Sequence, residues 1–151
     1  DDARLRDSFS YAEKAGLSFV FETSDEEMGH PNTSKIELWD GENGHVCVVV
    51  RSVGGGVVNV VEINGGEVMF SAEYDTTVIF NADKPGTVAQ ISAVFAENEI
   101  NIAFMRVFRK FEGKDAIMVI ETDQKVSKAV LDKLRSSKNI LKVITIPPLS
   151  V

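Results

Sequence analysis

Three polar side chains suited to binding a small zwitterion lie within four residues, at His30-Pro-Asn-Thr33. An amino-acid ligand needs hydrogen-bond donors for its carboxylate and acceptors for its ammonium group. The Asn32 amide supplies both, and the His30 imidazole and the Thr33 hydroxyl can each supply either. The motif therefore indicates a binding site for a small amino acid. Because asparagine and threonine beside proline also form ordinary turns, a plain turn is the alternative interpretation.

A second stretch that could bind a ligand runs from residue 76 to residue 105. Residues 76–80 are rich in β-branched and aromatic side chains, which predicts a strand. Pro85-Gly86 then suits the first turn of a helix, and another strand is expected from residue 100. Free backbone N–H groups at such a helix start can hold the carboxylate of a small ligand. The alternative is that this stretch is only a folding unit.

The sequence gives little support for catalysis by this chain alone. Its two histidines, His30 and His45, are too far apart in sequence to indicate a metal site, and no Walker or dinucleotide-binding motif is present. Cys47, the single cysteine, lies in an apolar run and is expected to be an inert strand residue. One thiol cannot by itself ligate a metal cluster, and its isolation fits a reducing compartment. We therefore expect a cytoplasmic small-molecule-binding or assembly chain.

Composition limits the partners of this chain. The net charge of −7 disfavours nucleic acid, and no stretch approaches the roughly 20 apolar residues that cross a membrane. No signal peptide is visible. The charge is uneven, because residues 1–75 carry 15 acidic and 5 basic side chains, whereas residues 76–151 carry 8 acidic and 11 basic ones. This change of sign near residue 75 indicates two modules.

Residues 1–75 predict a small, mostly antiparallel α+β domain. A helix is expected over residues 3–16, ended by Gly16, and alternation around Phe19 and Phe21 predicts a strand over residues 17–23. Further strands are expected at 34–39, 45–53, 57–63 and 67–74. Asn64-Gly65 is a strong hairpin signal, and the glycines at 54–56 permit either a strand bulge or the close approach of a ligand or another chain.

Residues 76–148 predict a βαββαβ unit, which is the order of the ferredoxin-like fold. Its helices are expected at 86–98 and 123–137, the second capped by Asp123, and its strands at 76–80, 100–109, 116–121 and 140–146. Both faces of the sheet require burial, since Ile117 and Val119 are apolar as well as Met118 and Ile120. The face without helices should therefore pair with another sheet, most simply in a homodimer.

Taken together and in order, these motifs resemble one protein family, the beta subunit of iron–sulfur-dependent bacterial L-serine dehydratase. The residues that carry the resemblance are distributed over nearly the whole chain. They are His30–Thr33, Ser52–Gly56 with Val60–Gly65, Asp83–Gly86, Ile100–Met105 and Gly113–Ile120.

The resemblance implies that residues 1–75 are the C-terminal part of an allosteric-substrate-binding-type domain and that residues 76–148 are an ACT domain, an amino-acid-sensing module. It implies a cytoplasmic enzyme that converts L-serine to pyruvate and ammonia, a step that serves gluconeogenesis. A [4Fe–4S] cluster on a partner alpha subunit would do the chemistry, leaving this chain non-catalytic and without a cofactor or metal of its own. The serine-rich loop with which the family's beta subunit normally begins has no counterpart here.

The resemblance also implies two sets of ligand-binding residues. His30, Asn32 and Thr33 match the motif that contacts serine. Asp83 to Gly86, together with Asn101 and Ile102, match the loop and second strand of an ACT effector site, in which Asp83 and Asn101 would face each other across a dimer interface. Two alternatives are a stand-alone ACT-type amino-acid sensor and the regulatory part of a phosphoglycerate dehydrogenase.

Overall fold

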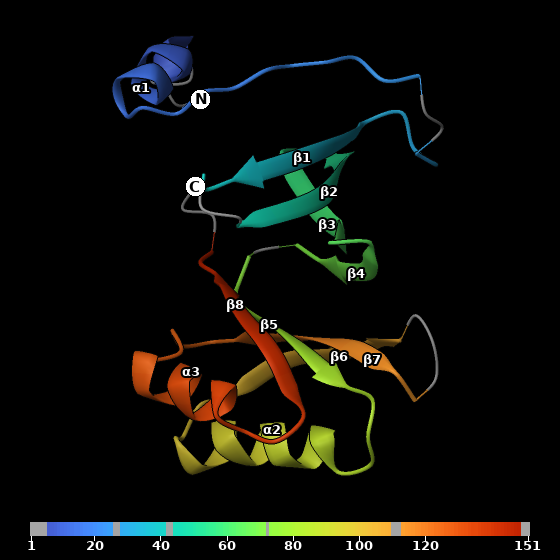
Figure 1. Cartoon of the computed structure of the whole chain (residues 1–151), viewed down its shortest axis with the longest axis vertical. Coiled ribbons are helices and arrows are strands. Elements are labelled where there is room, and N and C mark those ends of the chain that lie inside the picture. The colour runs from blue at the N-terminus through green and yellow to red at the C-terminus, as the bar shows by residue number, and fades with distance from the viewer. Residues whose placement is uncertain (1–5, 26–27, 42–43, 72, 110–112, 149–151) are drawn as a thin grey trace.

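The computed structural model describes residues 6–25, 28–41, 44–71, 73–109 and 113–148 and shows two four-stranded antiparallel sheets that face each other (Figure 1). The first sheet has the spatial order β1-β2-β3-β4 and the second the order β6-β7-β5-β8. The strands are β1 (Thr33–Trp39), β2 (His45–Gly54), β3 (Val57–Ile63), β4 (Gly66–Phe70), β5 (Asp75–Ala82), β6 (Ile102–Arg109), β7 (Asp115–Thr122) and β8 (Ile140–Ile146). The helices are α1 (Ser8–Lys14), α2 (Thr87–Glu97) and α3 (Lys128–Arg135).

The first sheet is built from consecutive hairpins. Gly54 at the end of β2 and the two glycines after it all have positive φ, so the triple glycine forms the turn to β3, and the strand register shifts between Ser52 and Gly54. Asn64 (φ 51°) and Gly65 (φ 77°) form the next turn. The Asn64 side chain also accepts a hydrogen bond from the backbone N–H of Cys47, over 2.9 Å, which ties the turn to β2.

The second sheet confirms the predicted βαββαβ order, and α2 and α3 cover one of its faces (Figure 1). Ile91 and Phe95 of α2 and Leu134 of α3 are fully buried against this face. They pack on residues that alternate along the central strands, including Ile79 on β5 and Met118 on β7. A period of two on the strands and of about 3.6 on the helices thus produces one apolar core.

The opposite face of the second sheet packs against the first sheet. Val78 and Val119 are almost fully buried there, in contact with a cluster that includes Val68 and Phe70 of β4. The prediction that this face pairs with another sheet is confirmed, but the sheet belongs to the same chain. The proposed homodimer contact cannot use this part of the face, because β3 and β4 already occupy it.

The prediction of a strand over residues 17–23 is wrong. These residues carry no strand pairing, and the Phe19 and Phe21 rings gather instead around Phe9 of α1, with centroids 5.1 and 5.7 Å from it. Alternation of aromatic residues therefore reflects this cluster and not a sheet face. The helix before it is shorter than predicted and buries none of its side chains, although Gly16 ends it with φ 76° as expected. Residues 3–5 of the predicted helix lie outside the described residues.

The start of α3 also differs from the prediction. Ser127, and not Asp123, is the N-cap, and its hydroxyl accepts a hydrogen bond from the backbone N–H of Val130 over 3.4 Å. The Asp123 carboxylate accepts a hydrogen bond from the side chain of Asn101. Among the helices of the described ranges, none combines the length and apolarity that crossing a membrane requires.

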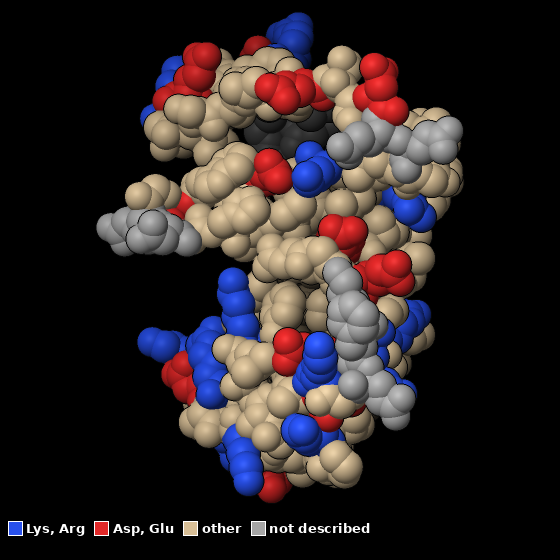
Figure 2. Space-filling model, turned by 45° about the vertical axis from the view of Figure 1, so that its right-hand side comes forward, with Lys and Arg blue, Asp and Glu red and all other residues tan. Residues whose placement is uncertain are grey.

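The charge change predicted near residue 75 is visible on the surface. Figure 2 shows lysine and arginine side chains gathered over the second sheet and its helices, in the lower part of the molecule. Acidic side chains are more frequent on the upper part, which holds α1 and the first sheet. The two halves therefore differ in surface chemistry as well as in fold.

Candidate functional site

The loop before β1 presents the His30–Thr33 motif at the surface. The His30 Nδ1 accepts a hydrogen bond from the backbone N–H of Asn32, over 3.2 Å, and the Thr33 hydroxyl donates to the backbone oxygen of His30 over 2.6 Å. The backbone oxygen of Asn32 in turn accepts from the N–H of Ser52 on β2, over 3.0 Å. The loop is thus fixed both internally and to the sheet, as an ordered turn would be.

The side-chain groups of this loop that could bind a ligand point to solvent. Because Nδ1 accepts a hydrogen bond, a neutral His30 imidazole carries its proton on Nε2 and can donate there. Within the described residues the side-chain amide of Asn32 makes no hydrogen bond, and both residues are exposed. The motif is therefore a turn. Its His30 Nε2–H can donate a hydrogen bond, and its Asn32 side-chain amide can both donate and accept.

Arg51 is a basic neighbour of this loop that sequence reasoning did not find. It lies directly opposite Thr33 in the register of β1 and β2, and its guanidinium donates to the backbone oxygen of Met28 over 3.0 Å. Its Nε is buried and has no hydrogen-bond partner among the described residues. A guanidinium is the side chain best matched to a carboxylate, so Arg51 adds a group of this kind beside the loop. Only the strand register, which the sequence motif does not encode, brings it here.

Asp83 is the anchor of the turn between β5 and α2. Its carboxylate accepts a hydrogen bond from the backbone N–H of Gly113, over 2.9 Å, and lies 3.4 Å from Arg109. The hydrogen bond from Gly113 and the positive charge of Arg109 lower the pKa of Asp83, although partial burial opposes them. Asp83 therefore joins this turn to the β6–β7 hairpin, and its acceptor positions are already used in part.

The start of α2 carries the free backbone N–H groups predicted from the sequence. Gly86 is its N-cap, with φ 85°, and among the described residues no side chain caps the helix. Two polar atoms on the elements that flank this turn, Asn81 Oδ1 on β5 and Thr87 Oγ1 on α2, are buried and have no hydrogen-bond partner among the described residues. Buried oxygens of this kind are uncommon unless water or a ligand reaches them. Sequence patterns identified the helix start but not these two atoms.

Asn101 and Ile102 lie at the other end of the second sheet. Asn101 is held by Gln124, whose side-chain oxygen accepts from its backbone N–H over 3.1 Å, and by Asp123 at 2.6 Å. Ile102 packs against the core under the helices. An eight-residue strand at about 3.3 Å per residue places Asp83 and Asn101 roughly 20 Å or more apart in one chain. They could share a ligand only if a second chain contributed one of them, so their common site stays a prediction.

The described residues contain no group of three or more histidine, cysteine, aspartate and glutamate side chains that could hold a metal ion. Cys47 is half-buried in β2. A [4Fe–4S] cluster is held by four cysteine thiolates, and this chain contains one cysteine in all. The residues present therefore do not fit such a cluster.

Comparisons with known proteins agree with this organisation. Residues 76–139 match the ACT domain family. The chain is 36% identical over 145 residues to a probable L-serine dehydratase beta chain of Bacillus subtilis, an alignment that covers 96% of this chain and 66% of that protein. It is 28% identical to the L-serine dehydratase beta chain of Peptoniphilus asaccharolyticus, over 86% of this chain and 59% of the relative.

A second group of relatives consists of D-3-phosphoglycerate dehydrogenases. D-3-phosphoglycerate dehydrogenase of Bacillus subtilis is 28% identical over 132 residues, which is 87% of this chain but 25% of that protein. The chain thus spans somewhat less than two thirds of the beta chains that it matches and about a quarter of this dehydrogenase.

Proposed function

Since the chain is a relative of L-serine dehydratase beta chains and contains an ACT domain over residues 76–139, we propose that it is the regulatory and assembly subunit of such an enzyme. The reaction it would serve is the conversion of L-serine to pyruvate and ammonia. The observation that carries the proposal is the 36% identity to the Bacillus beta chain over 96% of this chain, because that alignment spans both sheets.

In this proposal the catalytic cluster and its ligands belong to a partner alpha subunit. A [4Fe–4S] cluster on that subunit would supply the Lewis acidity that helps to expel the serine hydroxyl. The single cysteine of this chain cannot hold it, and so no step of the reaction is assigned to these residues. The role of this chain is to bind, to assemble and to regulate.

L-serine or another small amino acid is proposed to bind at the loop before β1. The Nε2–H of His30 and the Arg51 guanidinium would bind the carboxylate, while the Asn32 oxygen would accept from the ammonium group. Support comes from the ordered geometry of the loop, from the unpaired amide of Asn32 within the described residues and from the buried, unpartnered Nε of Arg51. The Thr33 hydroxyl instead holds the turn, because it donates to the backbone of His30.

Apolar side chains on the first module are proposed to form the surface that docks the alpha subunit. α1 and the segment after it expose large side chains, of which Val20 is 83% exposed and Phe21 79%. Strand β1 adds Ile36 and Leu38 on one face and Trp39, which is 68% exposed, on the other. Exposed apolar surface of this extent commonly marks a protein interface. A homodimer through the second sheet would need its free edges, β6 or β8, since the inner face is occupied.

Co-purification with a catalytic alpha chain tests this assembly. Co-expression should give a complex that survives gel filtration, and Trp39→Glu should weaken it because a charge would be buried at the interface. The matched control is Leu141→Glu on β8, which is similarly exposed but belongs to the second module. Failure of the unsubstituted chain to associate, or equal weakening by both variants, would contradict the proposal.

The regulatory part of a phosphoglycerate dehydrogenase is the second candidate. It is favoured by the relationship to the Bacillus dehydrogenase over 87% of this chain, which again includes both modules. Association of the chain with a separate dehydrogenase subunit, and no association with an alpha chain, would favour this candidate instead.

A further inference from the structure

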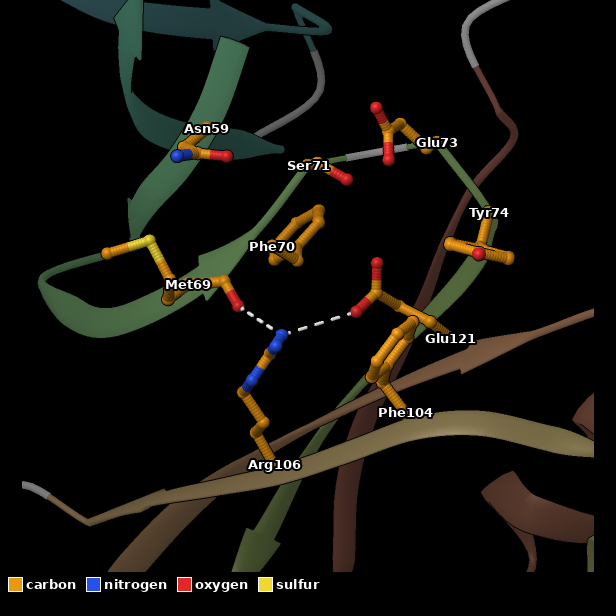
Figure 3. A pocket seen from close by; sticks show the side chains of 9 residues that line it. All are labelled: Asn59, Met69, Phe70, Ser71, Glu73, Tyr74, Phe104, Arg106 and Glu121. Atoms are coloured by element: carbon orange, nitrogen blue, oxygen red, sulfur yellow. Dashed lines mark hydrogen bonds and ion pairs between the residues drawn. The ribbon is translucent and has the colours of Figure 1, made fainter. Parts of the chain in front are cut away.

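A cavity of about 240 Å³ lies between the two sheets, at a place that none of the predicted site residues lines (Figure 3). Met69 and Phe70 of β4 form one wall together with Ser71, Glu73 and Tyr74, and Asn59 of β3 lies above. The opposite wall consists of Phe104 and Arg106 of β6 and Glu121 of β7. The full lining is Asn59, Met69, Phe70, Ser71, Glu73, Tyr74, Phe104, Arg106 and Glu121. The cavity therefore exists only where the two modules meet.

Glu121 is an acidic residue that is buried where the two sheets pack together. It is 3% exposed, on the same face of β7 as the apolar Val119. Burial raises the pKa of Glu121, the charge of Arg106 opposes this, and the nearby Glu73 adds to the rise. A carboxylate that loses water in this way needs a compensating positive partner.

Arg106 is only a partial positive partner for the Glu121 carboxylate. One nitrogen of its guanidinium serves two acceptors, the Glu121 carboxylate at 3.3 Å and the backbone oxygen of Met69 at 2.9 Å. The longer contact is at the limit of a hydrogen bond, and the Arg106 side chain, whose guanidinium lies over the Phe104 ring, is 44% exposed to solvent. Glu73, Glu121 and Arg106 together carry a formal charge of −1, so the cavity favours a further positive group.

The remaining lining suits a small polar molecule with such a group. In Figure 3 the Glu73 and Glu121 carboxylates and the Ser71 hydroxyl point into the same space between the sheets, and Asn59 adds an amide across it. The Tyr74 and Phe104 rings meet edge to face, with centroids 5.6 Å apart, and form an apolar side. The guanidinium of Arg106 at the open side can bind a carboxylate.

We propose that this cavity binds a small free α-amino acid, with its ammonium group on Glu121 and Glu73 and its carboxylate on Arg106. Because both sheets line the site, the ligand stabilises their contact and so links the first module to the ACT domain. This proposal is independent of the function proposed above, since it uses none of the residues of the loop before β1.

The four methionines of the chain allow a direct test by NMR with ¹⁵N-labelled methionine backbone amides. The backbone of Met69 lines the cavity, Met28 lies beside the loop before β1, and Met105 and Met118 belong to the core under the helices. Titration of the full chain with L-serine should shift the Met69 amide signal saturably and leave Met118 unchanged. A shift of Met28 alone would place the ligand at the loop and overturn the cavity site without touching the proposed function. No shift at Met69 at saturating millimolar L-serine would also overturn it.

Variants and analogues separate ligand binding from a purely structural ion pair. Glu121→Gln keeps the shape of the side chain and should weaken the Met69 titration at least about tenfold, whereas the exposed Glu97→Gln should not. Ser71→Ala serves as a milder second variant and should weaken it several-fold. Lactate, which lacks the ammonium group, should not shift Met69. Equal responses to L-serine and lactate, or unchanged binding in Glu121→Gln, would show that the acidic pair only holds the sheets together.

Discussion

Asp83 is the predicted site residue whose environment the structure defines most fully. The N–H of Gly113 and the charge of Arg109 lower its pKa in the folded chain, so the unfolded chain binds a proton more readily. The stability this group contributes is therefore present above its ordinary pKa and is lost as the pH falls through the folded value.

Asp83→Asn should consequently lower the free energy of unfolding at neutral pH, and the difference from the parent chain should shrink towards about pH 3. Urea unfolding at several pH values measures this. Asp132→Asn on the exposed face of α3 is the control and should show a smaller change. A constant difference across the pH range would mean that Asp83 does not titrate in this way.

Asn32 is the residue on which the proposed serine contact depends most. Asn32→Ala should weaken the affinity for L-serine by about 1–3 kcal/mol, because hydrogen bonds to a charged ligand are lost. Calorimetric titration measures the change, and Asn98→Ala, whose amide is tied to the α2 backbone, is the control. An unchanged affinity would remove Asn32 from the site.

The sequence predicts site residues that belong to local motifs. It does not predict those that join a site through long-range strand pairing or sheet packing. The His30–Thr33 loop and the turn at Asp83 are local, and the structure shows both as ordered turns. Arg51 reaches the loop only through the β1–β2 register, and Glu121 reaches its cavity only because two sheets pack together. No spacing in the sequence could indicate either contact.

At the scale of elements, α3 shows how local signals can compete. Both Asp123 and Ser127 are good N-cap residues, and the structure uses Ser127 while Asp123 holds Asn101. Residue type and apolar patterns predicted the strands of both sheets, but the strand expected over residues 67–74 ends at Phe70. The pattern at Phe19 and Phe21 failed because the two rings pack on Phe9 of α1, a contact that the alternation does not encode.

The capping assignment makes a testable prediction about the stability of α3. Ser127→Ala should lower the free energy of unfolding by about 1 kcal/mol, since it leaves the N–H of Val130 without its side-chain partner. Asp123→Ala affects only an exposed contact and should cost less than about 0.5 kcal/mol. Thermal or urea unfolding compares the two variants, and a larger effect at Asp123 would restore it as the functional cap.

At the scale of the whole molecule, one shared core joins the two modules. Phe70 of β4 is 2% exposed and packs in the same cluster as residues of β5 and β7. The sequence indicated that the second sheet needs a partner, but it could not say whether that partner was another copy or the same chain. The fold of residues 33–70 shows that the same chain, and not a second copy, covers the inner face of the second sheet.

Phe70→Ala should therefore destabilise the chain by about 3–5 kcal/mol and affect both modules together. Circular dichroism and the fluorescence of Trp39, which lies in the first sheet, should report one common transition in the parent chain. If the Trp39 signal changed at a different urea concentration from the helical signal, the two sheets would be folding independently.

The rate of pyruvate formation from L-serine tests the proposed function most directly. A cluster-loaded alpha chain would be assayed alone and with an equimolar amount of this chain, over a range of L-serine concentrations. The proposal predicts that this chain raises the rate or changes its dependence on L-serine, while this chain alone forms no pyruvate. An alpha chain whose rate and serine dependence are the same with and without this chain would contradict the account.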